Sequence, residues 1–167
     1  MTLSVLCTVV GVGATSLGDL IHGVQLQALA GNLHQQLLLA RSEAIKRNAR
    51  VVLCKSADGV SCAATGGWEQ GSLLFVDGNG TASREPSEPV LQRSPALPAG
   101  WRITANQPLA QYVAYGPLGG TQLASRAFQA GTFTVCRTSA EQVDAMQIII
   151  NATGRARVQK VRLDSCF

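Results

Sequence analysis

Histidine is nearly absent from this sequence, and so are the common sequence motifs of metal sites and enzyme active sites. The 167 residues include two histidines, His22 and His34, which lie twelve positions apart on a predicted helix and so do not form an i, i+4 pair. No two cysteines form a C-x-x-C pair, which speaks against a zinc site. The chain also lacks a G-x-S-x-G motif and a glycine-rich phosphate loop that opens a helix. We therefore expect no enzymatic activity, no cofactor and no metal ion, and we interpret both histidines as packing or solvated residues.

Charged residues are also few, at 14% of the chain, whereas hydrophobic residues make up 46%. A chain of this composition can bury a core, which excludes a disordered tail. Its length gives room for one domain plus a terminal element.

The charges are unevenly distributed. Residues 1–50 carry four basic and two acidic side chains, and residues 51–153 carry six basic and seven acidic ones. Residues 154–167 carry four basic side chains against the single acidic Asp164, which accounts for +3 of the total net charge of +4. A basic tail on a nearly neutral domain points to a polyanionic partner, with an ordinary solvated terminal strand as the alternative. The basic residues of the tail are Arg155, Arg157, Lys160 and Arg162.

No charge occurs in residues 1–18, and Asp19 is the first charged side chain. A membrane span needs about 20 residues, so this run is at the lower limit. A cleaved signal peptide is the alternative, but no basic residue precedes the run and no proline interrupts the helical pattern that follows it. We predict one continuous helix in which residues 1–22 span the membrane.

The rest of that helix, residues 23–50, is predicted to be an amphipathic spine. Apolar residues recur at steps of three or four, and Leu38 and Ile45 widen the stripe. Basic residues in the last turn suit the negative end of the helix dipole, so we expect the helix to stop near Asn48. The stripe consists of Leu26, Leu29, Leu33, Leu37, Ala40 and Ala44.

Residues 51–167 are predicted to form a globular β domain. Short runs with strand composition are separated by turn signals, of which Asp77-Gly78-Asn79-Gly80 is the clearest. Asp77, Asn79, Glu85 and Glu88 also offer oxygen ligands for calcium, but their spacing is not that of an EF-hand, and a plain hairpin turn is favoured. One long helix followed by seven or so strands predicts an α+β chain whose globular part is a sandwich-like pair of antiparallel sheets. The predicted strands are 51–54, 68–76, 90–91, 101–103, 112–115, 131–136, 146–150 and 155–163.

Five cysteines are present, and Cys7 lies in the apolar N-terminal run. The other four allow three pairings. Cys54 and Cys62 flank a segment rich in turn formers, which favours a disulfide that closes a hairpin, and Cys136 and Cys166 would then tie the C-terminal strand to an inner one. Disulfides indicate an oxidising compartment, which is the periplasm in a bacterium.

Several of these segments together resemble the GspH/FimT family of minor pseudopilins. They are the block LARSEAIKRN at residues 39–48, the strand that begins at Val51, the segment GWEQG at 67–71 leading to the strand that ends at Val76, and Gly-Arg-Ala-Arg at 154–157. The resemblance spans nearly the whole chain. It implies a membrane-spanning N-terminal helix packed on a β domain, with the subunit inserted into a pilus or pseudopilus by lateral helix packing.

The same resemblance implies partners and a location. The partners are other major and minor pilins, contacted through the N-terminal helix, and the bacterial inner membrane, which a single span crosses with the β domain in the periplasm. Methylation is a further family expectation. One departure concerns the N-terminus: family members begin with a short leader, a glycine at the prepilin peptidase site and Phe-Thr-Leu-Ile-Glu, whereas no glutamate precedes Glu43 here. We expect the true N-terminus to lie upstream of Met1, with a non-processed variant as the alternative.

In the FimT branch of this family, a Gly-Arg-x-Arg segment near the C-terminus is associated with DNA binding during natural transformation. Gly154, Arg155 and Arg157 match that segment, and Lys160 and Arg162 extend its charge. The resemblance thus implies double-stranded DNA as a partner, held through its phosphates with little base readout. The alternatives are a FimU-like pilus-tip assembly subunit without DNA binding and a GspH-like type II secretion pseudopilin.

Overall fold

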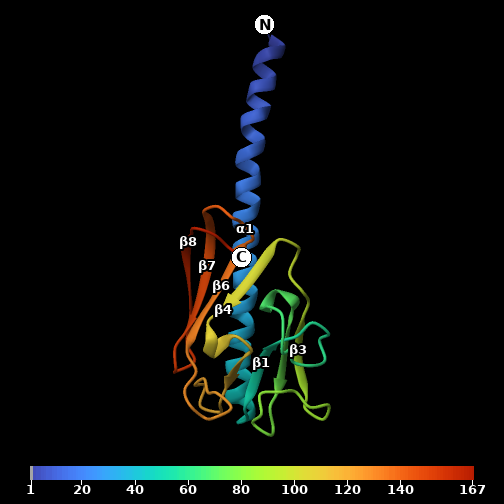
Figure 1. Cartoon of the computed structure of the whole chain (residues 1–167), viewed down its shortest axis with the longest axis vertical. Coiled ribbons are helices and arrows are strands. Elements are labelled where there is room, and N and C mark those ends of the chain that lie inside the picture. Colours follow the sequence, from blue (N-terminus) through green and yellow to red (C-terminus); the bar gives the residue numbers. More distant parts are fainter. Residues whose placement is uncertain (1) are drawn as a thin grey trace.

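The computed structural model describes the backbone of residues 2–167 and the side chains of residues 20–167. In this part of the chain, the helix α1 (Thr2–Arg47) precedes eight strands and two 3-10 helices, η1 (Trp68–Gln70) and η2 (Gln107–Leu109). Figure 1 shows the N-terminal half of α1 projecting from a head in which the strands lie along its C-terminal half. The strands are β1 (Val51–Lys55), β2 (Ser72–Val76), β3 (Val90–Ser94), β4 (Trp101–Ala105), β5 (Tyr112–Tyr115), β6 (Gly131–Arg137), β7 (Val143–Ile150) and β8 (Ala156–Leu163).

The helix is continuous, as predicted, but the predicted membrane span at residues 1–22 falls mostly on side chains outside the described set. Across the residues that are described, no helix contains a stretch both long and apolar enough to cross a membrane.

The predicted stripe of α1 is buried against the head, with one correction. Leu38 and Ile45 do not widen it, because their side chains are 45% and 51% exposed. Each directly follows a buried residue, and one step along an α-helix turns the side chain by about 100°, away from the stripe. Leu29 is partly buried. Ala30, which the prediction did not include, is buried beside it. The buried residues on this side of the helix are Leu26, Ala30, Leu33, Leu37, Ala40 and Ala44.

The helix ends where the sequence predicts. Arg47 is its last residue, and Asn48 adopts φ 48°, the left-handed conformation that commonly follows a helix. The backbone N–H of Asn48 donates to the carbonyl of Ile45 (3.2 Å) and that of Ala49 to the carbonyl of Ala44 (3.1 Å). This tight end turns the chain directly into β1.

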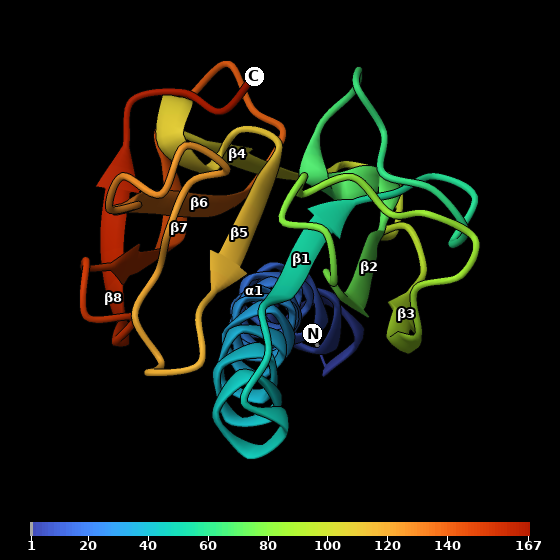
Figure 2. The same ribbon diagram turned by 90° about the horizontal axis from the view of Figure 1, so that it is seen from below.

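The strands form two four-stranded sheets, in which each pair of neighbours is antiparallel. The first sheet has the order β3-β2-β1-β5, and the second has the order β4-β6-β7-β8. Figure 2 shows the two sheets spreading to either side of α1, with β8 at the outer edge of the second sheet. The predicted fold class is therefore confirmed, including the inner position of the strand that contains residues 146–150.

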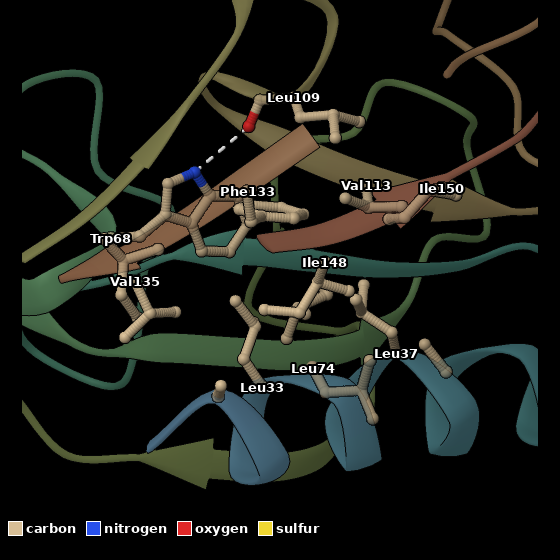
Figure 3. Packing of buried hydrophobic residues seen from close by; sticks show 14 of the residues in the cluster. Leu33, Leu37, Trp68, Leu74, Leu109, Val113, Phe133, Val135, Ile148 and Ile150 are labelled. Carbon is tan, nitrogen blue, oxygen red and sulfur yellow. Dashed lines mark hydrogen bonds between the residues drawn. The ribbon is translucent and has the colours of Figure 1, made fainter. Parts of the chain in front are cut away.

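The core lies where the two sheets meet the helix. Figure 3 shows Leu33 and Leu37 of α1 facing Ile148 of β7 and Leu74 of β2. At one end of this core the Trp68 indole N–H donates to the Leu109 carbonyl (3.0 Å), and its ring meets Phe133 edge-on with centroids 5.0 Å apart. Because helix and both sheets share this core, the head folds around the helix as one unit.

One predicted strand is partly wrong. Residues 68–76 were expected to be extended throughout, but Trp68–Gln70 form the 3-10 helix η1 and β2 begins at Ser72. Gly71 separates them at φ 114°, and a Cβ there would lie 2.7 Å from the Ser94 carbonyl oxygen and 2.8 Å from that of Ser56. The glycine allows a sharp change of direction that buries the Trp68 side chain before the strand starts.

Candidate nucleic-acid interface

The predicted DNA-binding segment begins in the turn between β7 and β8. The Asn151 side-chain oxygen accepts hydrogen bonds from the Arg155 backbone N–H (3.0 Å) and the Thr153 hydroxyl (2.7 Å). The Gly154 N–H donates to the Asn151 carbonyl (2.9 Å). These bonds hold Arg155 at a defined place at the start of β8.

Gly154 fixes this turn against the loop of residues 116–120. It is buried at φ 76°, and a Cβ at this position would lie 2.0 Å from the Gly119 carbonyl oxygen and 3.0 Å from a ring carbon of Tyr115. The Thr121 backbone N–H donates to the Ala152 carbonyl (3.3 Å) beside this contact. Gly154 therefore positions Arg155, and burial keeps it from presenting a surface to DNA itself.

The four basic residues of the tail do not gather on one surface. In the register of the second sheet, Arg157 lies opposite Ile149, whereas Lys160 lies opposite Met146 and Arg162 opposite Asp144. Since side chains alternate along a strand, Arg157 is on the outer face and the other two are on the face toward α1. Arg155 and Arg162 stand at opposite ends of β8, about 24 Å apart along an extended strand.

The far half of β8 also carries an acidic partner. The Lys160 ammonium lies 2.7 Å from an Asp144 carboxylate oxygen, with both side chains more than half exposed. The hydrogen bond from Lys160 lowers the pKa of Asp144, and the charges of Lys160 and Arg162 act in the same direction. Arg162 lines a cleft with Asp144, His22 and Arg137, and Arg137 in turn contacts the His22 ring (2.8 Å).

The turn end of β8 differs, because Arg155 and Arg157 are exposed and, among the described residues, no carboxylate lies within 4.0 Å of either. On the outer face, the residues that lie across the sheet from Arg157 are uncharged, and so are those in the next cross-strand row, which begins at Gln159. Arginine guanidiniums on such a face can donate to phosphate oxygens without competition from local acids. The uncharged neighbours in those rows are Ile149, Thr132, Gln159, Gln147, Thr134 and Thr104.

A residue outside the predicted set lies close to Arg155. Arg41 of α1 lines the same cleft as Arg155, although 114 positions separate the two in the sequence. Arg41 belongs to the family-like block at residues 39–48, and no role was predicted for it. No sequence signal connects it to the tail, because the two are brought together by the packing of α1 against the loop of residues 116–120.

The predicted disulfides are both present, Cys54–Cys62 and Cys136–Cys166. The second one ties the chain end to β6, and Cys166 exchanges backbone hydrogen bonds with Ser139 (3.0 and 2.8 Å). β8 is thus held at both ends, at the turn by Gly154 and after the strand by Cys166, so that its basic residues project from a fixed strand.

The calcium alternative finds no support in the geometry of its residues. Asp77 is buried, pairs with Arg50 (2.9 Å), and accepts the N–H groups of Gly80 and Ala82. Glu88 accepts the Gly78 and Glu85 N–H groups. These carboxylates organise the 77–89 loop, which is longer than the predicted tight hairpin. Over the described residues, no group of three or more side chains is placed to hold a metal ion.

Comparison with known proteins agrees with this architecture. Residues 29–154 match the family model described as type II transport protein GspH. The crystal structure of the type IV minor pilin FimU from Pseudomonas aeruginosa superposes with a TM-score of 0.62 at 18% identity, covering 85% of this chain and 95% of FimU. The minor pseudopilin EpsH from the type 2 secretion system of Vibrio cholerae gives a TM-score of 0.54 at 13% identity, covering 81% and 96% of the two chains. No curated protein matches the sequence.

A long N-terminal helix packed across two antiparallel sheets is a pilin-like fold, and the structural likeness establishes that class. The chain belongs to the GspH family, since the family model covers 126 of its 167 residues. The resemblance to GspH/FimT minor pseudopilins is therefore confirmed.

Proposed function

We propose that this protein is a minor pilin or pseudopilin that acts by binding rather than by catalysis, and that it captures double-stranded DNA during uptake. The family and fold support the first part: the helix is the element that would pack beside other pilins, and it would anchor the subunit in the inner membrane with the head in the periplasm. The two disulfides suit that oxidising compartment.

One observation carries the DNA proposal. Arg155 projects from the turn that Gly154 locks in place, and Arg157 from the adjoining start of β8, beside uncharged residues of the sheet. The remaining cations of β8 lie near Asp144. The contact is electrostatic and sequence-independent, because two or three arginines reach phosphates and no helix enters a groove. With two to three phosphates neutralised, the log–log salt slope is expected to be about −2 to −3.

The test is a binding titration of the full chain, purified in mild detergent, with a short fluorescent duplex at about 50 mM salt. Arg155→Gln combined with Arg157→Gln is expected to abolish measurable binding while thermal unfolding stays unchanged. The matched control, Arg137→Gln with Arg162→Gln, removes the same two charges at the other end of the same sheet. It is expected to retain most of the affinity. Absence of binding by the wild type, or equal loss in both double variants, would refute the proposed interface.

The second candidate is a type II secretion pseudopilin or a pilus-tip assembly subunit without DNA binding. It is favoured by the GspH family model and by the fold shared with EpsH and FimU. This candidate would be established if the wild-type chain is incorporated into a fibre and shows no binding to the duplex in the titration.

A further inference from the structure

Arg41 is held in a specific place on the helix, beside the buried stripe. It is half-buried next to Ala40, and it lies against the loop of residues 116–120. A Cβ on Gly119, which has φ 77°, would approach within 3.0 Å of the Arg41 Nε and 2.9 Å of Ile45 Cδ1. The absence of a side chain at 119 therefore leaves room for the guanidinium over the loop backbone.

Arg41 and Arg155 line one open cleft of about 750 Å³. The turn of β7–β8 and the loop of residues 116–120 form its walls, held together by the close approach of Gly154 to Gly119. Of the described residues that line the cleft, none is acidic, and the other polar side chains are Gln122, Asn151 and Thr153. The Asn151 side-chain oxygen is already occupied, so its NH₂ group is what it can offer to a ligand.

Among the described residues, no carboxylate lies within 4.0 Å of the Arg41 guanidinium. The nearby helix carboxylate, Glu43, pairs with Arg47 (2.5 Å) and Lys46 (3.8 Å). Tyr115, which packs against Gly154 near Arg41, remains a neutral phenol: burial raises its pKa, and the charge of Arg41 only partly opposes this. Its hydroxyl is buried without a hydrogen-bond partner among the described residues. Among the described residues, the cleft therefore presents the half-buried Arg41 and the exposed Arg155 with no carboxylate paired to either.

We propose that the cleft between Arg41 and Arg155 binds a phosphate group, and that this group is a phosphodiester of the bound DNA. Two guanidiniums present planar forks of N–H donors that match phosphate oxygens, and a rigid cleft lowers the entropy lost on binding. Arg41 would thus add a third phosphate contact to those of Arg155 and Arg157. This proposal rests on the proposed function, and it assigns to the helix a part of the DNA-binding surface.

The experiment compares Arg41→Gln with Arg93→Gln, which removes one charge from the first sheet, in the duplex titration of the full chain. Loss of one phosphate contact is expected to weaken binding about five- to tenfold at about 0.1 M salt and to reduce the salt slope by about 0.9. Arg93→Gln is expected to leave both unchanged. Arg41→Lys, which keeps the charge without the fork, is expected to recover part of the affinity.

A second pair of variants leaves Arg41 in place. Leu118 lines the cleft and is 96% exposed, so Leu118→Glu adds a negative charge without removing a packing contact. It is expected to weaken binding, whereas Leu118→Gln, the uncharged match, is not. If the wild type binds the duplex and both Arg41→Gln and Leu118→Glu bind equally well, the cleft proposal is wrong while the proposed function stands. If the wild type does not bind, the proposed function itself fails.

The source of the phosphate is separated by a titration with inorganic phosphate against chloride at equal ionic strength. Thermal stabilisation of the wild type but not of Arg41→Gln, with unchanged duplex affinity, would show a site for a free phosphate anion. Weaker duplex binding by Arg41→Gln assigns the cleft to the DNA backbone. If neither ligand distinguishes the two proteins, the cleft is not a phosphate site.

Discussion

The two sheets of the head have the same size and the same antiparallel pairing, yet their outer faces differ. On the first sheet, Val52, Leu73, Phe75 and Ala114 face away from α1 and are fully buried together with Ala82 of the 77–89 loop. On the outer face of the second sheet, the residues that lie across the strands from Arg157 and Gln159 are threonines, a glutamine and a single isoleucine.

An antiparallel sheet can leave one face in water, and on the second sheet only the half of the outer face near Arg157 is uncovered. The other half, around Ala145 and Cys136, is buried with Cys166 of the chain end. The first sheet therefore serves stability on both faces, while the second has part of one face open to a partner.

The strongest test of this difference is a pair of alanine substitutions, one on each outer face. Phe75→Ala removes a fully buried ring and is expected to cost about 3–5 kcal/mol in the free energy of unfolding. Thr134→Ala removes a half-buried polar side chain and is expected to cost less than about 1 kcal/mol. Denaturant unfolding measures both. Similar costs at the two sites would show that the outer faces do not differ in this way.

A smaller effect is expected from the disulfides, of which each sheet has one. The Cys54–Cys62 bond closes a loop with a sequence separation of 8, and the Cys136–Cys166 bond one of 30. In the chain-entropy description, replacing each pair by alanine costs about 2.6 and about 3.7 kcal/mol respectively. The bond of the second sheet is thus expected to contribute about 1 kcal/mol more. Urea unfolding of the two double variants tests the order, and a larger loss for the shorter loop would reverse it.

The smallest effect concerns acid. The pKa of Asp58, in the loop closed by Cys54–Cys62, is lowered mainly by the Ser61 backbone N–H, with further help from the Ser61 hydroxyl and the Val60 N–H. The pKa of Asp144 on the second sheet is lowered less, by Lys160. A carboxyl whose pKa is lower in the folded state stabilises the fold above its unfolded pKa of about 3.9, and this contribution is lost as the pH falls.

Unfolding measured from neutral pH downwards therefore provides the comparison. Asp58→Asn and Asp144→Asn are each expected to flatten the loss of stability below about pH 4, and Asp58→Asn more so. NMR titration of the two carboxyls should show Asp58 protonating at the lower pH. The opposite order would mean that the Lys160–Asp144 salt bridge lowers a carboxyl pKa more than the hydrogen bonds to Asp58 do.

Much of the fold could be predicted from local signals. The 3.6-residue spacing of Leu26, Leu33 and Leu37 marks the buried side of α1, and the pairing of Cys54 with Cys62 follows from the turn between them. The burial predicted for Leu38 was wrong, because the spacing of apolar residues does not show how much of the helix circumference the sheets cover. The predicted start of β2 was wrong because Gly71 is compatible with either a turn or a strand. Only its close approach to the carbonyl oxygens of Ser56 and Ser94 shows that the chain turns there.

The candidate site could be predicted only in part. The Gly-Arg-x-Arg segment marked Arg155 and Arg157, and the structure leaves both exposed and unpaired among the residues it describes. Alternation along residues 155–163 already places Lys160 on the opposite face from Arg157, but the sequence alone did not show which face packs toward α1, because that depends on the sheet's contacts with the helix. Gly154 was assigned to binding, whereas its contact with Gly119 shows a positioning role.

By itself the sequence determined the order of the architecture, helix before β domain, and the basic character of the chain end, and it favoured the Cys54–Cys62 disulfide. These depend on periodicity, composition and short-range spacing, which act between residues close in the chain. Only the tertiary structure decided which cations are free, which are paired, and that Arg41 joins Arg155 at one cleft. Those outcomes depend on contacts between residues far apart in the chain, and such contacts exist only once the helix and both sheets share a core.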